Sequence, residues 1–284
     1  MSTSQSILGE GPLWDASTGQ LLSIDCMGRK LLRHNVQSGK HEEWALPRTP
    51  GSFALRSGSG MLMAYRRGLA FIEPGTPMLE GIPAPGIDFA VEVFNDGKCD
   101  RKGRFWVGTM DRDVQQPVGG LYRVGPDLQV TRMDDGVTLG NGIAWSPDDR
   151  TMYFCDSRPG RIWAYDYDLE TGSIENRRLF VDFAGRQGRP DGCTIDAEGG
   201  LWVAEISAGQ VVRFDPAGRE VANLAVPVSR PTSVAFGGAG LRTLFVTSMR
   251  YGVSPEDLIR EPQAGCVFAA DVGVAGLPPA RFGG

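Results

Sequence analysis

The sequence has few of the residues on which the most familiar catalytic and metal sites depend. Only two of the 284 residues are histidines, and these, His34 and His41, lie close together in one short stretch. A histidine-based catalytic triad or a histidine-rich zinc site is therefore not expected. The sequence also lacks a Cys-x-x-Cys pair, a phosphate-binding Gly-x-x-x-x-Gly-Lys-Ser/Thr loop and a Gly-x-Gly-x-x-Gly motif between a strand and a helix.

Long runs of basic or apolar residues are also missing. The formal charge is −5, the pI is about 5.2, and the lysines and arginines are scattered, so neither nucleic acid nor membrane is an expected partner. No apolar stretch approaches the length of a membrane span, and residues 1–8 lack the basic and apolar regions of a signal peptide. The five cysteines, an odd number at irregular spacing, are typical of buried free thiols in a reducing compartment. These features predict a cytoplasmic protein.

What the sequence has in quantity is a repeated pattern of turns and short apolar runs. Six segments begin with a small or polar residue and continue with apolar alternation: residues 11–14, 52–55, 97–100, 142–145, 192–195 and 233–236. Successive segments begin 41 to 50 residues apart, and each is followed by a turn and further β-rich runs. No segment shows a long apolar period of 3.6 residues, so strands are expected to dominate.

Repeats of this length, each with about four strands, are the signature of propeller blades. Six of them predict one all-β domain over residues 1–284, a six-bladed β-propeller of four-stranded blades. The alternative is a pair of β-sandwich domains, but sandwiches do not need the same four-strand unit six times over. We also expect the N-terminal and C-terminal segments to meet in the last blade.

The residues just before the six repeat starts are the candidates for a site. They are Glu10, Gly51, Asp96, Asn141, Asp191 and Thr232. Because the inner strands of a propeller line its central channel, Glu10, Asn141 and Asp191 are predicted to share one small ring. Their oxygen donors suit one hard divalent cation, such as Ca²⁺, Mg²⁺ or Mn²⁺, with Zn²⁺ less typical. Since these residue types also begin strands and cap turns, a structural role is the alternative at any single position.

At these positions the sequence resembles the regucalcin, gluconolactonase and luciferin-regenerating enzyme family. The matching segments cover nearly the whole chain in the family's order: residues 9–14 (GEGPLW), 94–98 (FNDGK), 103–110 (GRFWVGTM), 141–146 (NGIAWS), 190–192 (PDG), 200–204 (GLWVA), 230–233 (RPTS) and 236–238 (FGG). The resemblance implies a six-bladed propeller that hydrolyses aldonolactones, with one divalent metal ion held by Glu10, Asn141 and Asp191. It also implies that Asn95 contacts the substrate near the metal, and that Asp113 binds the sugar where better-known members carry Glu.

One departure from the family concerns the substrate. Members that act on sugar lactones often carry Arg at the position of Val93, commonly preceded by Asn, where this sequence has Glu92. Arg would donate several fixed hydrogen bonds to sugar hydroxyls, whereas Val donates none. Because strand alternation puts Glu92 and Val93 on opposite faces, we expect only one of them to line the site. Val93 therefore predicts a lactone that is less polar than glucono-1,5-lactone, or differently substituted.

The expected reaction is the hydrolysis of a small cyclic ester, with the lactone as the partner. The metal would polarise the carbonyl and lower the pKa of a bound water. Asp191 is the candidate for accepting the proton of that water, or else serves only as a ligand. Asn95, Asp113 and Val93 would contact the substrate, and Asp96 would cap the turn into its strand. Two alternatives remain: a propeller hydrolase for phosphotriesters or related esters, and a non-catalytic calcium-binding regulatory propeller.

Overall fold

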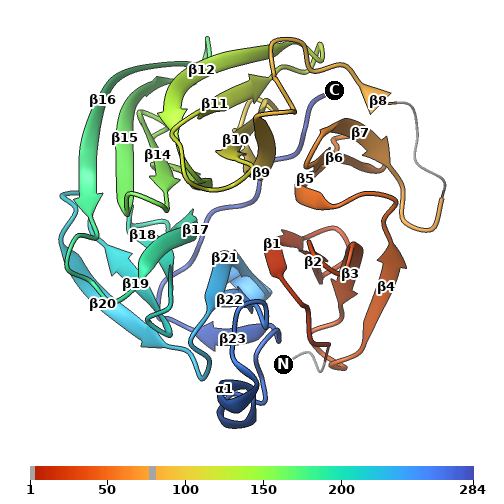
Figure 1. Cartoon of the computed structure of the whole chain (residues 1–284), viewed down its shortest axis with the longest axis vertical. Helices are drawn as coiled ribbons and strands as arrows, with labels where there is room; N and C mark the ends of the chain where they lie inside the picture. The colour runs from red at the N-terminus through yellow and green to blue at the C-terminus, as the bar shows by residue number, and fades with distance from the viewer. Residues whose placement is uncertain (1–3, 77–80) are drawn as a thin grey trace.

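A computed structural model describes residues 4–76 and 81–284 of the chain. Its strands form six antiparallel sheets that stand as blades around one central axis (Figure 1). Within each sheet the strands follow one another in chain order, which is the meander that short hairpin turns between strands produce. The predicted six-bladed propeller is therefore confirmed, and the alternative of two β-sandwiches is wrong.

Each blade begins with its innermost strand and proceeds outward. The innermost strands are β1 (Gly9–Asp15), β5 (Pro50–Leu55), β9 (Glu92–Cys99), β13 (Gly140–Trp145), β17 (Arg189–Ile195) and β21 (Pro231–Gly237). The second strands are β2 (Gln20–Asp25), β6 (Met61–Tyr65), β10 (Phe105–Asp111), β14 (Thr151–Asp156), β18 (Leu201–Ile206) and β22 (Thr243–Ser248). The third strands are β3 (Lys30–His34), β7 (Gly68–Ile72), β11 (Gly119–Val124), β15 (Arg161–Asp168), β19 (Gln210–Phe214) and β23 (Phe268–Asp271). The outermost strands are β4 (His41–Ala45), β8 (Gly81–Ile82), β12 (Val130–Val137), β16 (Ser173–Asp182) and β20 (Glu220–Ala225).

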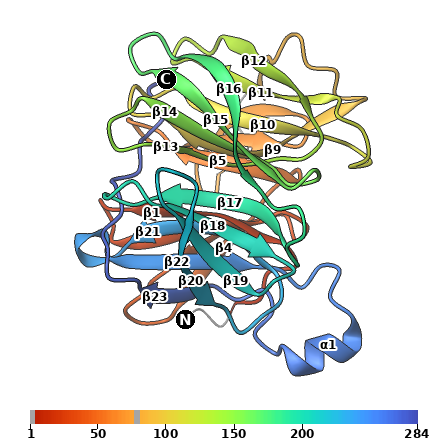
Figure 2. The ribbon, with the colours of Figure 1, turned by 90° about the vertical axis from the view of Figure 1, so that its left-hand side faces the viewer.

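Five blades thus have four strands, and the sixth has three among the residues described. Helical structure there is limited to the one-turn η1 (Ala239–Leu241) and the short α1 (Pro255–Arg260), which projects from the rim of the ring (Figures 1 and 2). No helix in residues 4–76 and 81–284 has the length and apolar character needed to cross a membrane.

Burial follows the position of a strand within its blade. Every residue of the second strands β6 and β18 is buried, because neighbouring blades cover both faces of these strands. The outermost strands β4 and β20 are mostly exposed. The predicted buried free thiols are confirmed, since all five cysteines are buried and none forms a disulfide bond: Cys26, Cys99, Cys155, Cys193 and Cys266.

The two ends of the chain join the propeller at different places. The backbone N of Ser6 donates to the carbonyl of Gly265 at 2.8 Å, which ties the N-terminal segment to the last blade. Residues 272–284 instead leave blade six and cross one face of the ring, where Phe282 bridges Arg56 of blade two (Figure 2). The expectation that both segments meet in the last blade is therefore wrong for the C-terminal one. This tail covers the face at which the inner strands end.

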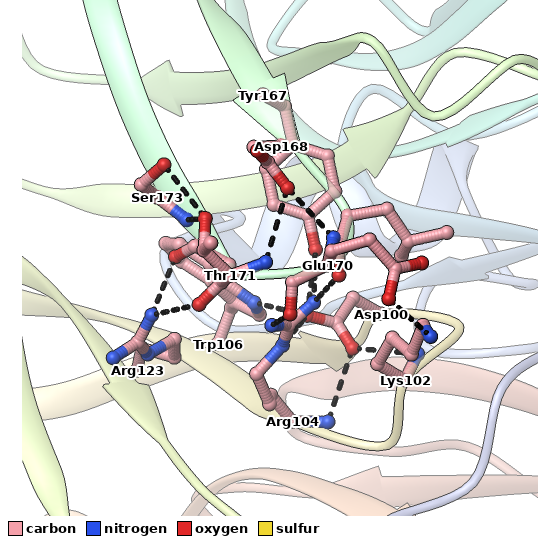
Figure 3. Close-up of polar contacts among 12 residues, drawn as sticks. Asp100, Lys102, Arg104, Trp106, Arg123, Tyr167, Asp168, Glu170, Thr171 and Ser173 are labelled. Atoms are coloured by element: carbon pink, nitrogen blue, oxygen red, sulfur yellow. Dashed lines mark hydrogen bonds and ion pairs between the residues drawn. The ribbon is translucent and has the colours of Figure 1, made fainter.

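A buried carboxylate organises the turn at that end of blade three (Figure 3). Asp100 follows β9, and its Oδ2 accepts hydrogen bonds from Nε of Arg104 at 2.6 Å, Nε1 of Trp106 at 2.9 Å and the hydroxyl of Tyr167 at 2.7 Å. Its Oδ1 accepts from the backbone N of Lys102 and of Arg104. A fully paired carboxylate of this kind stabilises the turn and joins blade three to blade four.

Blade five repeats this arrangement after β17. Oδ2 of Asp196 accepts from Nε1 of Trp202 at 2.8 Å and from Nε of Arg213 at 2.7 Å. Its Oδ1 accepts from the backbone N of Glu198 and of Gly200. The same residue types thus perform the same structural task in two blades, as the sequence repeat implies.

Candidate metal and substrate site

Each inner strand carries a β-bulge or another irregularity near its start. In β9, β13 and β17 two residues stand opposite one residue of the neighbouring strand, and the first of each pair is Asn95, Asn141 or Asp191. In β1 the bulge follows Glu10 directly. A bulge interrupts strand alternation and redirects side chains. Asn95, Asn141 and Asp191 are therefore released from regular strand alternation, and Glu10 immediately precedes the corresponding irregularity of β1.

The bulges also define which residue of blade three is equivalent to Asn141 and Asp191. By position in the bulge it is Asn95, whereas the sequence repeat put Asp96 at that place. Oδ1 of Asp96 accepts from the backbone N of Gly97 at 2.8 Å, which agrees with the capping role expected from the sequence.

Two glycines allow neighbouring inner strands to approach at this level. A Cβ on Gly142 would lie 2.6 Å from the carbonyl oxygen of Asp191, and a Cβ on Gly192 would lie 2.0 Å from Oγ of Ser233. No side chain fits within such distances. The glycine after Asn141 and the glycine after Asp191 are therefore required for blades four, five and six to close tightly around the axis.

A chain of hydrogen bonds links the candidate side chains across three blades. Nδ2 of Asn95 donates to Oδ1 of Asn141 at 2.6 Å. Nδ2 of Asn141 donates to Oγ of Ser157 at 2.7 Å, and Ser157 donates in turn to the carbonyl oxygen of Pro190 at 2.5 Å. Pro190 immediately precedes Asp191. The structure thus joins Asn95, Asn141 and the backbone beside Asp191 in one network and fixes the orientation of both amides.

The carboxylates of the site repel one another. Burial raises the pKa of Glu10 well above its ordinary value, and the charges of Asp191 and Asp96 raise it further. Burial and the charge of Asp96 likewise raise the pKa of Asp191, and burial raises that of Asp96. In the described part of the chain, none of these three forms an ion pair with lysine, arginine or histidine. Such a cluster favours binding of a cation, which would remove the repulsion.

The nearest lysine does not neutralise the cluster. Lys98 lowers the pKa of Asp96, but its Nζ donates to the carbonyl oxygen of Cys193 at 2.6 Å. Because Lys98 belongs to β9 and Cys193 to β17, this side chain crosses the channel below the carboxylates. It therefore helps to close the channel and leaves the oxygens of Glu10 and Asp191 available.

The available donors fit a hard divalent cation. Glu10 and Asp191 offer carboxylate oxygens, and Asn141 offers an amide oxygen whose direction is set by the bond from its Nδ2 to Ser157. In residues 4–76 and 81–284, no three side chains of the types His, Cys, Asp and Glu form a metal-binding group. A metal site here would depend on the asparagine as well as on acids, so the ligand set of Glu10, Asn141 and Asp191 stays a prediction.

The two residues before Phe94 face different ways, as alternation predicted. Glu92 is turned into blade three, where its carboxylate accepts from the hydroxyl of Tyr122 at 2.8 Å and from Thr109. Val93 is buried and pairs directly with Met110 across β9 and β10. Of this pair, Val93 is the one that shares a face with Met110.

Asp113 is an exposed turn residue, whereas the other candidates belong to inner strands. It belongs to an exposed turn after β10, which is shaped by Asp111 accepting from the backbone N of Gln115 and of Gln116. Among the residues described, Asp113 forms no hydrogen bond with another candidate side chain.

Sequence reasoning missed two residues that contact the candidates. Arg66 donates to Oδ1 of Asn95 at 2.9 Å, and Ser157 accepts from Asn141. Both directly follow the second strand of their blade. The repeat was applied only to the starts of inner strands, and the same register applied to the ends of second strands would have indicated both.

A cavity of about 430 Å³ lies elsewhere, between blades one and six. It is lined by side chains such as Trp14, His34 and Phe245, and none of the candidate site residues contributes to its wall. This cavity is therefore separate from the polar cluster at the channel.

Comparison with known proteins shows what the chain is similar to. A family profile described as the SMP-30/gluconolactonase/LRE-like region matches residues 8–250. Regucalcin of Gallus gallus is 37% identical over 284 residues, which cover 98% of this chain and 95% of that protein. These matches span every candidate residue.

Solved structures give the same result. The calcium-binding protein regucalcin from Agrobacterium tumefaciens has a TM-score of 0.93 and 31% identity, covering 98% of this chain and 95% of its own. A luciferin-regenerating enzyme has a TM-score of 0.91 and 29% identity, covering 99% and 97%. The resemblance drawn from the sequence motifs is therefore confirmed.

Proposed function

The chain belongs to the SMP-30/gluconolactonase/LRE-like family, and from this premise we propose that it is a divalent-metal-dependent hydrolase that opens a small lactone. The observation that carries the proposal is the group of acidic and amide side chains from separate blades at the start of the channel, with raised carboxylate pKa values and no paired cation among the described residues. That a similar structure is described as a calcium-binding protein supports a divalent ion as the cofactor.

We assign the metal to Glu10, Asn141 and Asp191. The chemistry that a divalent cation supplies when bound is polarisation of an ester carbonyl and acidification of a water molecule. Two carboxylates provide charge, while the neutral amide of Asn141 completes the set without adding repulsion. The bond from its Nδ2 to Ser157 would set the direction of the Asn141 oxygen, which accepts from Asn95 and keeps a second lone pair for an ion.

Asp191 is the residue to which we assign proton transfer. As a ligand of the ion, its carboxylate would touch both the metal and the bound water and would lie within reach of the water's proton. In hydrolysis, water adds to the carbonyl carbon, the bond from that carbon to the ring oxygen breaks, and the ring oxygen gains a proton. Asp191 would accept the proton of the water and deliver it to the departing ring oxygen.

The substrate contacts complete the proposal. Asn95 is held between Arg66 and Asn141, so its amide is positioned to orient a lactone next to the metal ligands. Val93 would add an apolar wall on the same face, and Asp113 would act from the exposed loop after β10 on the part of the substrate farthest from the ester.

The test is a titration assay for acid release from several lactones and a phosphotriester, before and after exhaustive removal of metal. Chelated protein is expected to lose lactonase activity and to regain it with one of Ca²⁺, Zn²⁺, Mg²⁺ or Mn²⁺. Full activity without metal would contradict the mechanism. Calcium binding without hydrolysis of any ester would instead favour a regulatory calcium-binding propeller, and cleavage of the phosphotriester alone would indicate the other esterase class.

A further inference from the structure

Arg66 stands at the junction of blades two and three, directly after β6. Its backbone N donates to the carbonyl oxygen of Thr49 at 2.9 Å, and its own carbonyl oxygen accepts from the backbone N of Phe94 at 3.1 Å. The main chain at this position is therefore tied to both blades, and the side chain starts from a rigid base.

The guanidinium is held from one side only. Its Nη1 donates to Oδ1 of Asn95 at 2.9 Å and to the carbonyl oxygen of Phe94 at 3.2 Å, and lies 3.1 Å from Sδ of Met110. In the part of the chain that the structure describes, Nε and Nη2 donate to no protein acceptor and Arg66 forms no ion pair. Since a guanidinium has five N–H groups, three of them are left for water or a ligand.

The charge of Arg66 acts on the candidate site. It lowers the pKa of Glu10, opposing the larger effects of burial and of the neighbouring carboxylates, so the two groups are near one another. Arg66 is half-buried, and burial lowers the pKa of its guanidinium. A fixed and only partly satisfied cation beside the carboxylates is suited to binding polar oxygen atoms.

Val93 and Met110 show where these donors lie relative to the substrate residues. The two are paired directly across β9 and β10, so their side chains share one face. Arg66 contacts Met110 and also Asn95, the second residue after Val93 in β9. A guanidinium from blade two therefore stands beside the surface on which Val93 itself offers no donor.

We infer that Arg66 is a specificity-determining residue that donates from Nε and Nη2 to the hydroxyl oxygens of a polyhydroxylated lactone. The inference rests on the proposed lactonase function. Val93 alone predicts a less polar lactone, because it donates no hydrogen bond. Arg66 reverses that expectation, since it supplies the missing donors from another blade. A site with fixed donors discriminates strongly against analogues without the matching hydroxyls, since the donors then lose their water and gain no partner.

The experiment compares kcat/KM for glucono-1,5-lactone, a pentonolactone and δ-valerolactone in wild type, Arg66→Met and Arg66→Lys. For Arg66→Met we expect a fall of roughly 10–100-fold on the hydroxylated lactones, mainly through KM, and less than about 3-fold on δ-valerolactone. Arg66→Lys keeps the charge but not the planar fork, so its activity on hydroxylated lactones should fall between the two. Arg67→Met is the matched control, because Arg67 is the exposed neighbour and is expected to behave as wild type.

A second variant separates substrate binding from support of Asn95. Val93→Arg in the Arg66→Met background places a guanidinium on the same face from β9, and it should restore at least part of the preference for hydroxylated lactones. If Arg66 only held Asn95 in place, Arg66→Met would lower activity on all three lactones by the same factor and Val93→Arg would restore nothing.

Failure of the inference is distinguishable from failure of the proposed function. An equal effect of Arg66→Met on all lactones overturns the assignment of Arg66 and leaves the lactonase intact. Wild-type protein that hydrolyses none of the lactones with any of the metals overturns both. Preference of the wild type for δ-valerolactone also overturns the inference and returns the choice of substrate to Val93.

Discussion

Strands β9 and β17 carry acidic residues at both ends, and the two ends differ in how those acids are paired. In the bulges of the two strands, the half-buried Asp96 and the buried Asp191 form no ion pair among the described residues, and desolvation raises the pKa of each. Just past their ends, Asp100 and Asp196 are buried and accept hydrogen bonds from arginine, tryptophan and backbone N–H groups.

The difference separates a structural acid from a binding acid. A buried carboxylate whose oxygens are all paired stabilises the fold, because its desolvation is offset within the protein. A group of buried carboxylates that repel one another costs stability, and such a cost persists where it serves function. Asp191 and Asp196 are both buried aspartates, so burial and residue type do not separate them, whereas their partners do.

The largest effect is expected from Asp191→Asn. Loss of a ligand should lower kcat/KM by more than the roughly 10–100-fold typical of residues that only support ligands. Because the charge of Asp191 raises the pKa of Glu10, the variant should be at least as stable as wild type when metal is absent. Thermal unfolding with chelator and with added metal measures this, and the metal-induced shift should be small in the variant. Wild-type activity in Asp191→Asn would falsify the assignment.

The opposite result, a loss of stability without a loss of activity, is expected for Asp100, just past the end of β9. Asp100→Asn leaves the charge of Arg104 buried without a counterion, at a cost of about 3 kcal/mol in the free energy of unfolding. Urea unfolding measures the loss. The activity per folded molecule should stay within about 2-fold of wild type, because Asp100 contacts none of the proposed site residues. A stable but inactive Asp100→Asn would contradict the division between the two ends.

The sequence was sufficient to predict the ring of inner strands but not the position of every side chain on those strands. The repeat placed Glu10, Asn141 and Asp191 at equivalent positions, because inner strands of a propeller start at one face. It could not predict the bulges, which depend on pairing with the next strand, and it therefore aligned Asp96 instead of Asn95 with Asn141. Arg66 was missed because the repeat was applied only to the starts of inner strands, whereas Arg66 follows the second strand of blade two and contacts Asn95 from there.

The two ends should also respond oppositely to pH. The pKa values of Glu10, Asp96 and Asp191 are raised in the folded protein, so their contribution to stability is full below the ordinary carboxylate pKa and is lost as pH rises through the folded values. Asp168 lies near Asp100, at the end of β15 (Figure 3). Its pKa is lowered because the backbone N–H groups of Thr171 and Glu170 donate to its carboxylate. Its contribution is present above the ordinary value and is lost as pH falls through the folded one.

Metal-free protein should therefore become more stable as pH is lowered from 8 towards the ordinary carboxylate pKa of about 4, and less stable below it. Saturating metal should remove the first trend, since a bound cation holds the site carboxylates in their charged form. Thermal unfolding across this range in chelator and in metal measures both. If the metal-free protein instead became more stable with rising pH over the whole range, the site carboxylates would not be destabilising one another.

The smallest effect is expected from Lys102→Met, in the same corner as Asp100 (Figure 3). Nζ of Lys102 lies 2.8 Å from Oε2 of Glu170, but the two side chains are 46% and 77% exposed. Water already solvates both charges, and ordering two long side chains offsets most of the attraction, so the variant should lose less than about 1 kcal/mol of unfolding free energy. Urea unfolding at low and high salt measures the change, and salt should reduce it further. A loss comparable to that of Asp100→Asn would mean that the number of charges in this corner, and not the burial of Asp100 and its partners, determines its stability.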